Sequence, residues 1–413
     1  MSEDHPFRRE IHDEIHARPI VLVGLPSRVR RLVFQQPGPG KVTSAFEAFR
    51  HFCETEGLAP PQPYSRQHTF ERDGLIISWE FHTEFITITW AAPLENEESE
   101  PKNIGLELVD EFGLVSASRV DVMDKPAIPK ELVPGFSQMS FCHAAVDDGK
   151  AEIATDFSED QDGFVRFELA AKNLSDRRRA ILSRRLLEIE TYAKMALLTL
   201  PMTRSASGDL GALETSVSDC IRKLPDISDI AAAKKAMDNL NTLSLKLGAL
   251  SENLNYRIAA AQAYGTVLSE RLAALRDVPT GTGSSLSQYL NNRVNPAIRT
   301  IVAFEKRLDI ATQKVARAVA MLNARNGLEL EIQNSEILNT ISKTAHSQFQ
   351  LQKTVEGLSA IAISYYLIGI LSYALAGPMQ YFHWDKVWTL SIIAPFVFLI
   401  VYLVSRRFWH GAE

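Results

Sequence analysis

The feature that most constrains this chain is an uncharged stretch near its carboxyl end. From Gly357 to Trp384 the sequence contains no Asp, Glu, Lys or Arg. Within it, Leu358–Ala376 is an apolar run of 19 residues, which as a helix would extend ~28 Å, close to the ~30 Å of a bilayer's hydrocarbon core. A second apolar run, Val387–Val404, follows. The two runs predict two transmembrane helices; the alternative is a helical hairpin buried in a soluble core.

The overall composition hides these runs. The chain has 413 residues with 44 Lys+Arg against 50 Asp+Glu, a net charge of −6, so we expect no nucleic-acid partner. Its three cysteines, Cys53, Cys142 and Cys220, are odd in number and far apart. This pattern excludes a disulfide framework and suits a reducing compartment.

The distribution of charge around the apolar runs predicts their orientation. Lys353 precedes the first run and Arg406-Arg407 follow the second, whereas the connecting segment carries only Asp385 and Lys386. Because positive charge is retained on the cytoplasmic side, we expect a two-pass anchor with both termini in the cytoplasm. Met1–Arg18 is polar and has no apolar signal-peptide core, so we expect the preceding body to be cytoplasmic.

Residues 1–173 combine strand-like and helical patterns. Alternating apolar residues predict several strands, among them Val29–Gln35 and Met139–Val146. Asp73-Gly74 is typical of a tight hairpin turn, and Lys41–Glu56 carries phenylalanines at helical spacing. We therefore predict a cytoplasmic α+β domain with a largely antiparallel sheet.

Residues 174–356 have helical periodicity and form a second region. One helix is expected from Asp176 to about Leu200 and a shorter one over Leu210–Leu224. Beyond them, apolar residues recur every seven positions, which predicts coiled-coil-like helices. These rows consist of Leu240, Leu247, Leu254, Ala261, Leu268 and Leu275, and then of Ile301, Leu308, Val315 and Leu322.

A further long helix is expected to begin at Asn295-Pro296, because proline is favoured at the first position of a helix. No proline follows between Ala297 and Gly377, so this helix could continue through the first apolar run over ~120 Å. The alternative is a set of separate helices with a kink near Gly327. The apolar row resumes in this segment at Ile337, Ile341, Leu351, Val355 and Leu358.

Two resemblances follow from these features. The run His5-Pro6 together with His16-Ala17-Arg18-Pro19 and the two closing apolar runs resembles a bacterial family of uncharacterised, predicted membrane-anchored proteins. This resemblance covers essentially the whole chain. It implies location in the bacterial cytoplasmic (inner) membrane and carries no assigned activity.

The second resemblance is architectural. An α/β domain, long helices, a two-helix transmembrane hairpin over 357–404 and a basic-aromatic cytoplasmic tail over 405–413 are similar to the CorA magnesium-transporter superfamily. Those proteins are homopentamers whose first span lines a pore, with a Gly-Met-Asn motif at its mouth. This chain reads Gly377-Pro378-Met379-Gln380 there, so the motif that confers Mg²⁺ selectivity is absent. The resemblance implies a homo-oligomer, a pentamer if CorA-like, with a divalent cation as a candidate ligand and no required cofactor.

Within the first apolar run, Ser364 and Ser372 are the candidate pore-lining residues, and Gly377, Met379 and Gln380 are the candidate loop residues. Hydroxyl and carbonyl oxygens can replace part of a cation's hydration shell, whereas intramembrane charge is costly. The alternative is a small-residue face that only packs helices together. That face would comprise Ala362, Gly369, Ser372 and Ala376.

Other motifs are weaker. His12 and His16 are spaced as in zinc-binding helices, but no third ligand can be named, and docking of the amino-terminal segment onto the domain is the preferred interpretation. We find no nucleophile–base pair and no phosphate-binding loop, so we expect no enzyme. Two functions remain. One is a CorA-like oligomeric channel or transporter for cations or other small solutes, gated by its cytoplasmic domain. The other is a membrane-anchored scaffold or signalling module without transport activity.

Overall fold

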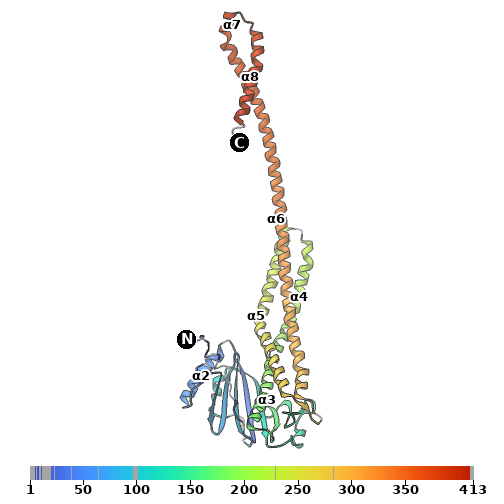
Figure 1. Cartoon of the computed structure of the whole chain (residues 1–413). Coiled ribbons are helices and arrows are strands. Elements are labelled where there is room, and N and C mark those ends of the chain that lie inside the picture. Colours follow the sequence, from blue (N-terminus) through green and yellow to red (C-terminus); the bar gives the residue numbers. More distant parts are fainter. Residues whose placement is uncertain are drawn as a thin grey trace. The chain divides into compact units, whose positions relative to one another are not determined.

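The structure is a computed structural model that describes residues 5, 7–8, 11, 20–22, 24–38, 40–63, 65–95, 101–227, 229–281 and 283–409, the last five as backbone only. Contacts divide the chain into two compact units, Met1–Val319 and Ala320–Glu413. The first contains a β-sheet and several long helices, and the second contains two apolar helices (Figure 1). The predicted α+β domain followed by long helices and two closing apolar helices is thus confirmed.

The first unit is built on a nine-stranded sheet with the order β2-β3-β4-β1-β5-β8-β7-β6-β9. Neighbouring strands are antiparallel except β5 and β8, which are parallel, so the sheet is mixed. The strands are β1 (Ser27–Gln35), β2 (Gln67–Arg72), β3 (Leu75–Phe81), β4 (Phe85–Pro93), β5 (Gly113–Met123), β6 (Cys142–Val146), β7 (Ala151–Glu159), β8 (Val165–Ala170) and β9 (Val278–Pro279). Two short 3₁₀ helices, η1 (Leu106–Val109) and η2 (Val133–Gly135), connect strands.

The predicted strand over Met139–Val146 begins later than expected. Residues 138–140 form a turn and β6 starts at Cys142. The backbone nitrogen of Ser140 donates to the carbonyl of Ser137 at 3.2 Å and closes this turn, and the nitrogen of Ser137 donates to the carboxylate of Asp156 at 2.8 Å. The predicted β2–β3 hairpin is confirmed, with both Asp73 and Gly74 at positive φ, as a two-residue turn between twisted strands requires.

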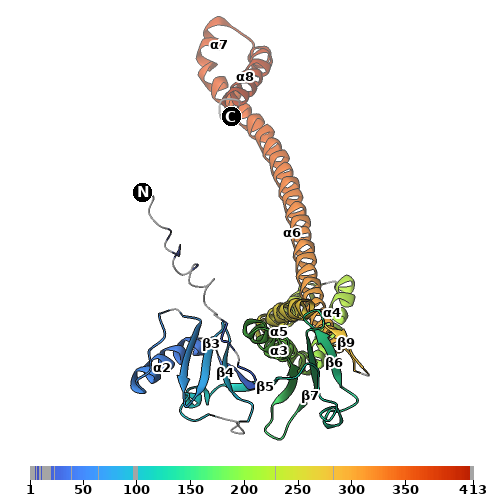
Figure 2. The same ribbon diagram turned by 60° about the horizontal axis from the view of Figure 1, so that its bottom comes forward.

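Helix α2 (Lys41–Thr55) covers one face of the β2-β3-β4-β1 half of the sheet (Figure 2). Phe49 is fully buried and stacks on Trp79 with ring centroids 4.5 Å apart. The Trp79 indole nitrogen donates to the carbonyl of Ile104 at 3.0 Å, so its polar atom is satisfied inside the core. Because side chains alternate along a strand, the neighbours of Trp79, Ser78 and Glu80, face the other side.

That other side is covered by α3 (Asp176–Leu197), by α5 (Ile230–Leu275) and by the start of α6 (Leu286–Ala374). Leu186 of α3, Phe167 of β8 and Leu290 of α6 belong to one apolar core. The helices therefore complete the sheet's hydrophobic core and do not form an independent bundle.

Helix α4 (Thr199–Lys223) begins directly after α3, so the predicted start at Leu210 was wrong. Pro201 is the third residue of α4, where a backbone N–H has no intrahelical acceptor. The proline therefore costs no helical hydrogen bond. A short 3₁₀ helix, η3 (Leu224–Asp226), then leads toward α5.

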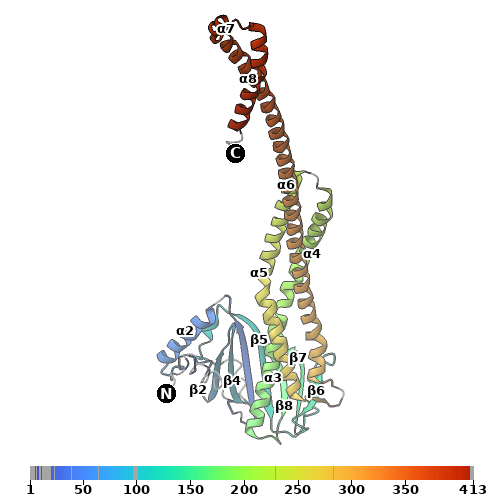
Figure 3. The same cartoon turned by 45° about the horizontal axis from the view of Figure 1, so that its top comes forward.

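Helices α4 and α5 and the first part of α6 run side by side (Figure 3). Every residue of the predicted seven-residue rows from Leu240 to Leu322 is buried. Polar pairs join the helices at their margins: Gln262 donates to Glu305 at 2.9 Å, and Arg307 donates to Glu214 at 2.6 Å. The predicted long helices are confirmed, and the seven-residue rows lie on their buried sides.

Helix α6 begins at Leu286, so the predicted start at Pro296 was wrong. The hydroxyl of Ser285 accepts from the backbone nitrogen of Gln288 at 3.1 Å, which caps the helix, and the buried Leu286 anchors its first turn. Pro296 lies inside the helix, where it removes one backbone donor. The helix continues past Gly327 to Ala374, as the prediction of one long helix required.

The break between α5 and α6 forms a strand that was not predicted. Val278 and Pro279 pair with Ala145 and Ala144 as β9. Farther along, the backbone nitrogen of His143 donates to the carbonyl of Ser284 at 3.1 Å. The connection between the two helices is therefore fixed to the outer side of β6.

Candidate functional site in the apolar hairpin

Two helices are long and apolar enough to span a membrane: α6 in its carboxyl-terminal part, and α8 (Lys386–Trp409) over Lys386–Val404. Only 6% of the apolar window of each helix is buried. The alternative of a hairpin enclosed in a soluble core does not agree with this exposure.

The segment between the two apolar runs was expected to be a loop, and this expectation was wrong in part. Residues Ala376–Phe382 form a short helix, α7. Pro378 is its third residue, a position that needs no backbone donor. After α7, the Asp385 carboxylate accepts from the backbone nitrogen of Val387 at 2.8 Å and so caps α8.

The carboxyl-terminal part of α6 packs against α8 through one face. Ser364, a predicted site residue, belongs to this packed face: it is 3% exposed, and its hydroxyl donates to the carbonyl of Ala360 at 2.7 Å. The remaining contacts of this small apolar cluster come from Ile368, Leu371, Ile393, Val397 and Val401. Ser364 therefore serves the contact between the two helices within one chain.

The predicted loop residues lie on α7. Met379 is buried, and its backbone carbonyl accepts from the nitrogen of Trp384 at 3.0 Å. Gly377 and Gln380 are exposed. The structure thus leaves the Gln380 amide open to the surroundings at this end of the hairpin.

A second set of residues lies along a face of the helix that Ser364 does not occupy, and we call it the stripe: Ala362, Tyr365, Gly369 and Ser372 of α6, and Ala376, the first residue of α7. Its members recur at alternate spacings of four and three residues, the pattern of a helix seam. Ala362 is two residues from Ser364, about 200° around the helix. Tyr365 is 75% exposed, Ala362 and Ala376 are exposed, and Gly369 and Ser372 are half-buried.

The same spacing extends the stripe backwards along α6 into the apolar row: Ile337, Ile341, Leu351, Val355 and Leu358. All five side chains of the apolar row are more than half exposed. The row is flanked on one side by the uncharged residues Gln333, Thr340, Ser347 and Thr354. The seam therefore runs along a single face of α6, with the polar residues Thr344 and Gln348 at the positions between Ile341 and Leu351, and it has no partner within the chain among the described residues.

The amino-terminal family-motif residues are mostly outside the described part. His5 is described: it is exposed, and its Nδ1 accepts from the nitrogen of Phe7 at 3.2 Å. Pro6, His16, Ala17, Arg18 and Pro19 lie outside the described residues, as does His12, the other histidine of the zinc hypothesis. No group of three metal-ligating side chains occurs within the described ranges.

Comparison with known proteins gives one match. A family model described as "Protein of unknown function (DUF3422)" matches residues 3–411. No curated protein and no solved structure matches the chain.

Proposed function

Because the chain belongs to this DUF3422 family of proteins of unknown function, we propose its role from its own structure: a homo-oligomeric inner-membrane protein whose first spans surround a pathway for a cation or another small solute. Both termini would be cytoplasmic, and the α+β unit would gate the pathway. The observation that carries this proposal is the stripe, which lies on a face of the helix that Ser364 does not occupy.

The composition of the stripe suits a helix interface at an axis. Glycine and alanine allow helix backbones to approach closely in a membrane. Tyr365 and Ser372 supply hydroxyl groups, which can interact with a partly hydrated cation without the cost of a buried charge. The hairpin contact already occupies Ser364, so Ser372 is the better candidate for a pathway serine.

The apolar row supports assembly through the same face of the helix. Five large apolar side chains on one helix face need a partner in water, and a second copy of α6 offers the matching heptad spacing. The uncharged flanking residues pose no like-charge repulsion between identical helices in parallel. Copies joined along the apolar row would bring their stripes together.

The order of the parts adds a resemblance to the CorA superfamily, from which a pentamer would follow. The departure at Gly377-Pro378-Met379-Gln380 argues against Mg²⁺ as the preferred ion, so a different cation or a small neutral solute is the proposed cargo. In that arrangement the exposed Gln380 would lie near the outer end of the pathway.

The test is flux through liposomes reconstituted with the full chain. The key variant is Gly369→Leu, because a side chain at Gly369 meets no atom within 4 Å in the single chain but would fill the proposed axis. Gly357→Leu is the matched control, since Gly357 is equally open and lies off the seam.

We expect saturable flux for the wild type and for Gly357→Leu, and loss of flux or of the oligomer for Gly369→Leu. An assembled oligomer that passes none of a panel of monovalent and divalent cations and small neutral solutes would overturn the pathway. The second candidate, a membrane-anchored scaffold, would then stand, because the apolar row could equally receive the helix of a partner protein.

A further inference from the structure

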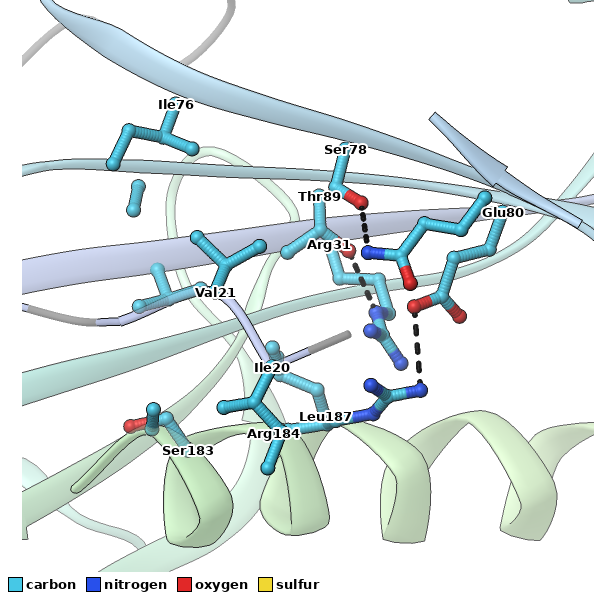
Figure 4. A pocket seen from close by; sticks show the side chains of 14 residues that line it. Ile20, Val21, Arg31, Ile76, Ser78, Glu80, Thr89, Ser183, Arg184 and Leu187 are labelled. Atoms are coloured by element: carbon cyan, nitrogen blue, oxygen red, sulfur yellow. Dashed lines mark hydrogen bonds and ion pairs between the residues drawn. The ribbon is translucent and has the colours of Figure 1, made fainter. Parts of the chain in front are cut away.

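Polar groups in the cleft between the sheet and α3 find partners within the chain. Arg184 lies 3.4 Å from Glu80, and Arg31 donates to the hydroxyl of Thr89 at 2.9 Å (Figure 4). The polar side chains along the seam of α6 between 334 and 348 are instead exposed on the single chain. A polar group at the centre of a helix seam needs a hydrogen-bond partner from the helix that packs against it.

Three polar residues occupy positions of the seam itself, and we call them the polar core positions: Asn334, Thr344 and Gln348. Asn334 lies three residues before Ile337 and so continues the alternate spacing of the seam backwards along α6. Asn334 and Gln348 are two heptads apart, or ~21 Å along the helix. The two amides therefore recur at the same heptad position, with the apolar layers of Ile337 and Ile341 between them.

The positions beside the seam offer no charge by which a partner could be selected. In coiled coils, charged flanking residues usually set partner choice, whereas a polar residue inside the seam can do so at a cost in stability. Between 333 and 354 the flanks of this seam are uncharged on both sides: Gln333, Thr340, Ser347 and Thr354 on one, and Leu338, Ala345 and Gln352 on the other. Over this part of α6, selection of a partner falls to the polar core positions.

The chemistry of the polar core positions is complementary to itself. An amide is both donor and acceptor, so two identical amides at one level can satisfy each other. Parallel copies of α6 in one register place Gln348 beside Gln348 and Asn334 beside Asn334. The Thr344 hydroxyl donates to the carbonyl of Thr340 at 2.9 Å, and its oxygen can still accept from an amide of the neighbouring copy. An apolar helix in the same place would leave both amides without a partner, which costs free energy.

We propose that the polar core positions make the seam selective for a second copy of this chain, in parallel and in register. The apolar row by itself would accept any apolar helix, whereas an identical helix also carries amides at both levels. This inference rests on the proposed function, because the bilayer has to hold all copies in one orientation. It adds the identity of the partner, and it does not depend on whether a solute passes.

The first measurement is oxidative cross-linking of Leu351→Cys in the membranes of producing cells. The background is Cys220→Ser, because Cys220 is half-buried, whereas Cys53 and Cys142 are buried. Pairing in register places residue 351 of one copy beside residue 351 of the next, so we expect a cross-linked dimer. Phe349→Cys is the matched control: its side chain is 65% exposed against 66% for Leu351, but it lies off the seam and should give little cross-linked dimer.

The second measurement is the choice of partner. Chains carrying Leu351→Cys, with and without the pair Asn334→Leu and Gln348→Leu, are produced together under two different tags, and the cross-linked pairs are quantified. Leucine favours helix and both positions are exposed, so the single chain keeps its fold. Mixed pairs should be at least about fivefold rarer than random assortment gives, because each amide opposite a leucine loses its hydrogen bond.

The matched control for partner choice is the pair Asn339→Leu and Gln350→Leu, which removes two exposed amides that lie off the seam. Mixed pairs of these chains with the unchanged seam should form at random. Random assortment of the Asn334→Leu, Gln348→Leu chains, while Leu351→Cys still cross-links, would overturn this inference and leave the proposed assembly standing. Equal cross-linking at 349 and 351 would overturn both.

Discussion

Arg257 of α5 donates from a terminal nitrogen to the carboxylate of Glu84 at 2.6 Å, and Glu84 is 2% exposed. Glu84 lies in the turn between β3 and β4, so this ion pair connects a hairpin of the sheet to a helix far along the chain. The Arg257 carbonyl in turn accepts from the hydroxyl of Thr199 at 2.8 Å, at the start of α4. A single buried arginine therefore joins the sheet to two helices.

We expect Glu84→Gln to destabilise the first unit by about 3–5 kcal/mol, because it leaves the Arg257 charge buried without its partner. Replacing both residues with apolar ones should recover part of the loss, since no unpaired charge then remains. The measurement is urea unfolding of the detergent-solubilised chain, followed by the fluorescence of the buried Trp79 and Trp90. An unchanged unfolding midpoint for Glu84→Gln would show that the pair is energetically neutral.

The second prediction concerns pH. Burial, assisted by the charge of Asp121, raises the pKa of Glu168 to about 7. Between about pH 4.5 and 7 the folded protein keeps a proton that the unfolded chain has released, so this group makes the unfolding free energy fall as pH rises. Glu168→Gln should therefore gain stability relative to the wild type across this window, by up to about 2–3 kcal/mol above pH 7. Parallel stability curves for the two proteins between pH 4 and 8 would contradict the assignment.

The third prediction concerns Gly283. A Cβ at this position would lie 2.6 Å from the backbone nitrogen of His143, which belongs to β6 and cannot move freely. We expect Gly283→Ala to cost about 1–3 kcal/mol in unfolding free energy. Gly248→Ala is the control, because it faces open space within α5 and should stabilise by about 0.5–1 kcal/mol. Thermal unfolding would rank the two variants, and equal midpoints would refute the close approach.

The fourth prediction separates assembly from folding. Ile341→Glu places a charge in the apolar row, which is exposed in the single chain. Unfolding of the protomer should be unchanged, whereas the mass in detergent should shift toward smaller species. Ile332→Glu is the matched control, because Ile332 is similarly exposed but lies off the row. A monomeric wild type would remove the basis for both the assembly and the pathway.

Features with a strong local cause could be predicted from the sequence. Asp73-Gly74 specifies its hairpin through positive φ at both residues, and the seven-residue leucine spacing of α5 predicts its buried side. The helix start predicted at Pro296 was wrong, because the cap at Ser285 and the burial of Leu286 outweigh the loss of one backbone donor at the proline. In both successful predictions the sequence pattern lies within the element that it specifies.

The candidate sites depend on contacts between distant segments. Arg31, Glu80, Arg184 and Arg271 line one cavity and come from two strands and two helices, and nothing in their spacing indicates that they meet. Ser364 was predictable as a polar residue of an apolar helix, but the side it faces is set by its contact with α8. Sequence periodicity identified the faces of α6, and only the structure distinguished the occupied face from the open one.

The two-residue strand β9 has a consequence for how the protein is made. Until Val278 and Pro279 leave the ribosome, the outer side of β6 is an unpaired strand edge, the kind of surface that recruits other chains into aggregates. The whole of α5 is synthesised after β6 and before β9, so the edge of β6 stays unpaired during that time. Once β9 is in place, Pro279 offers no backbone donor to a further strand. The same short segment that completes the sheet thus closes it against intermolecular pairing.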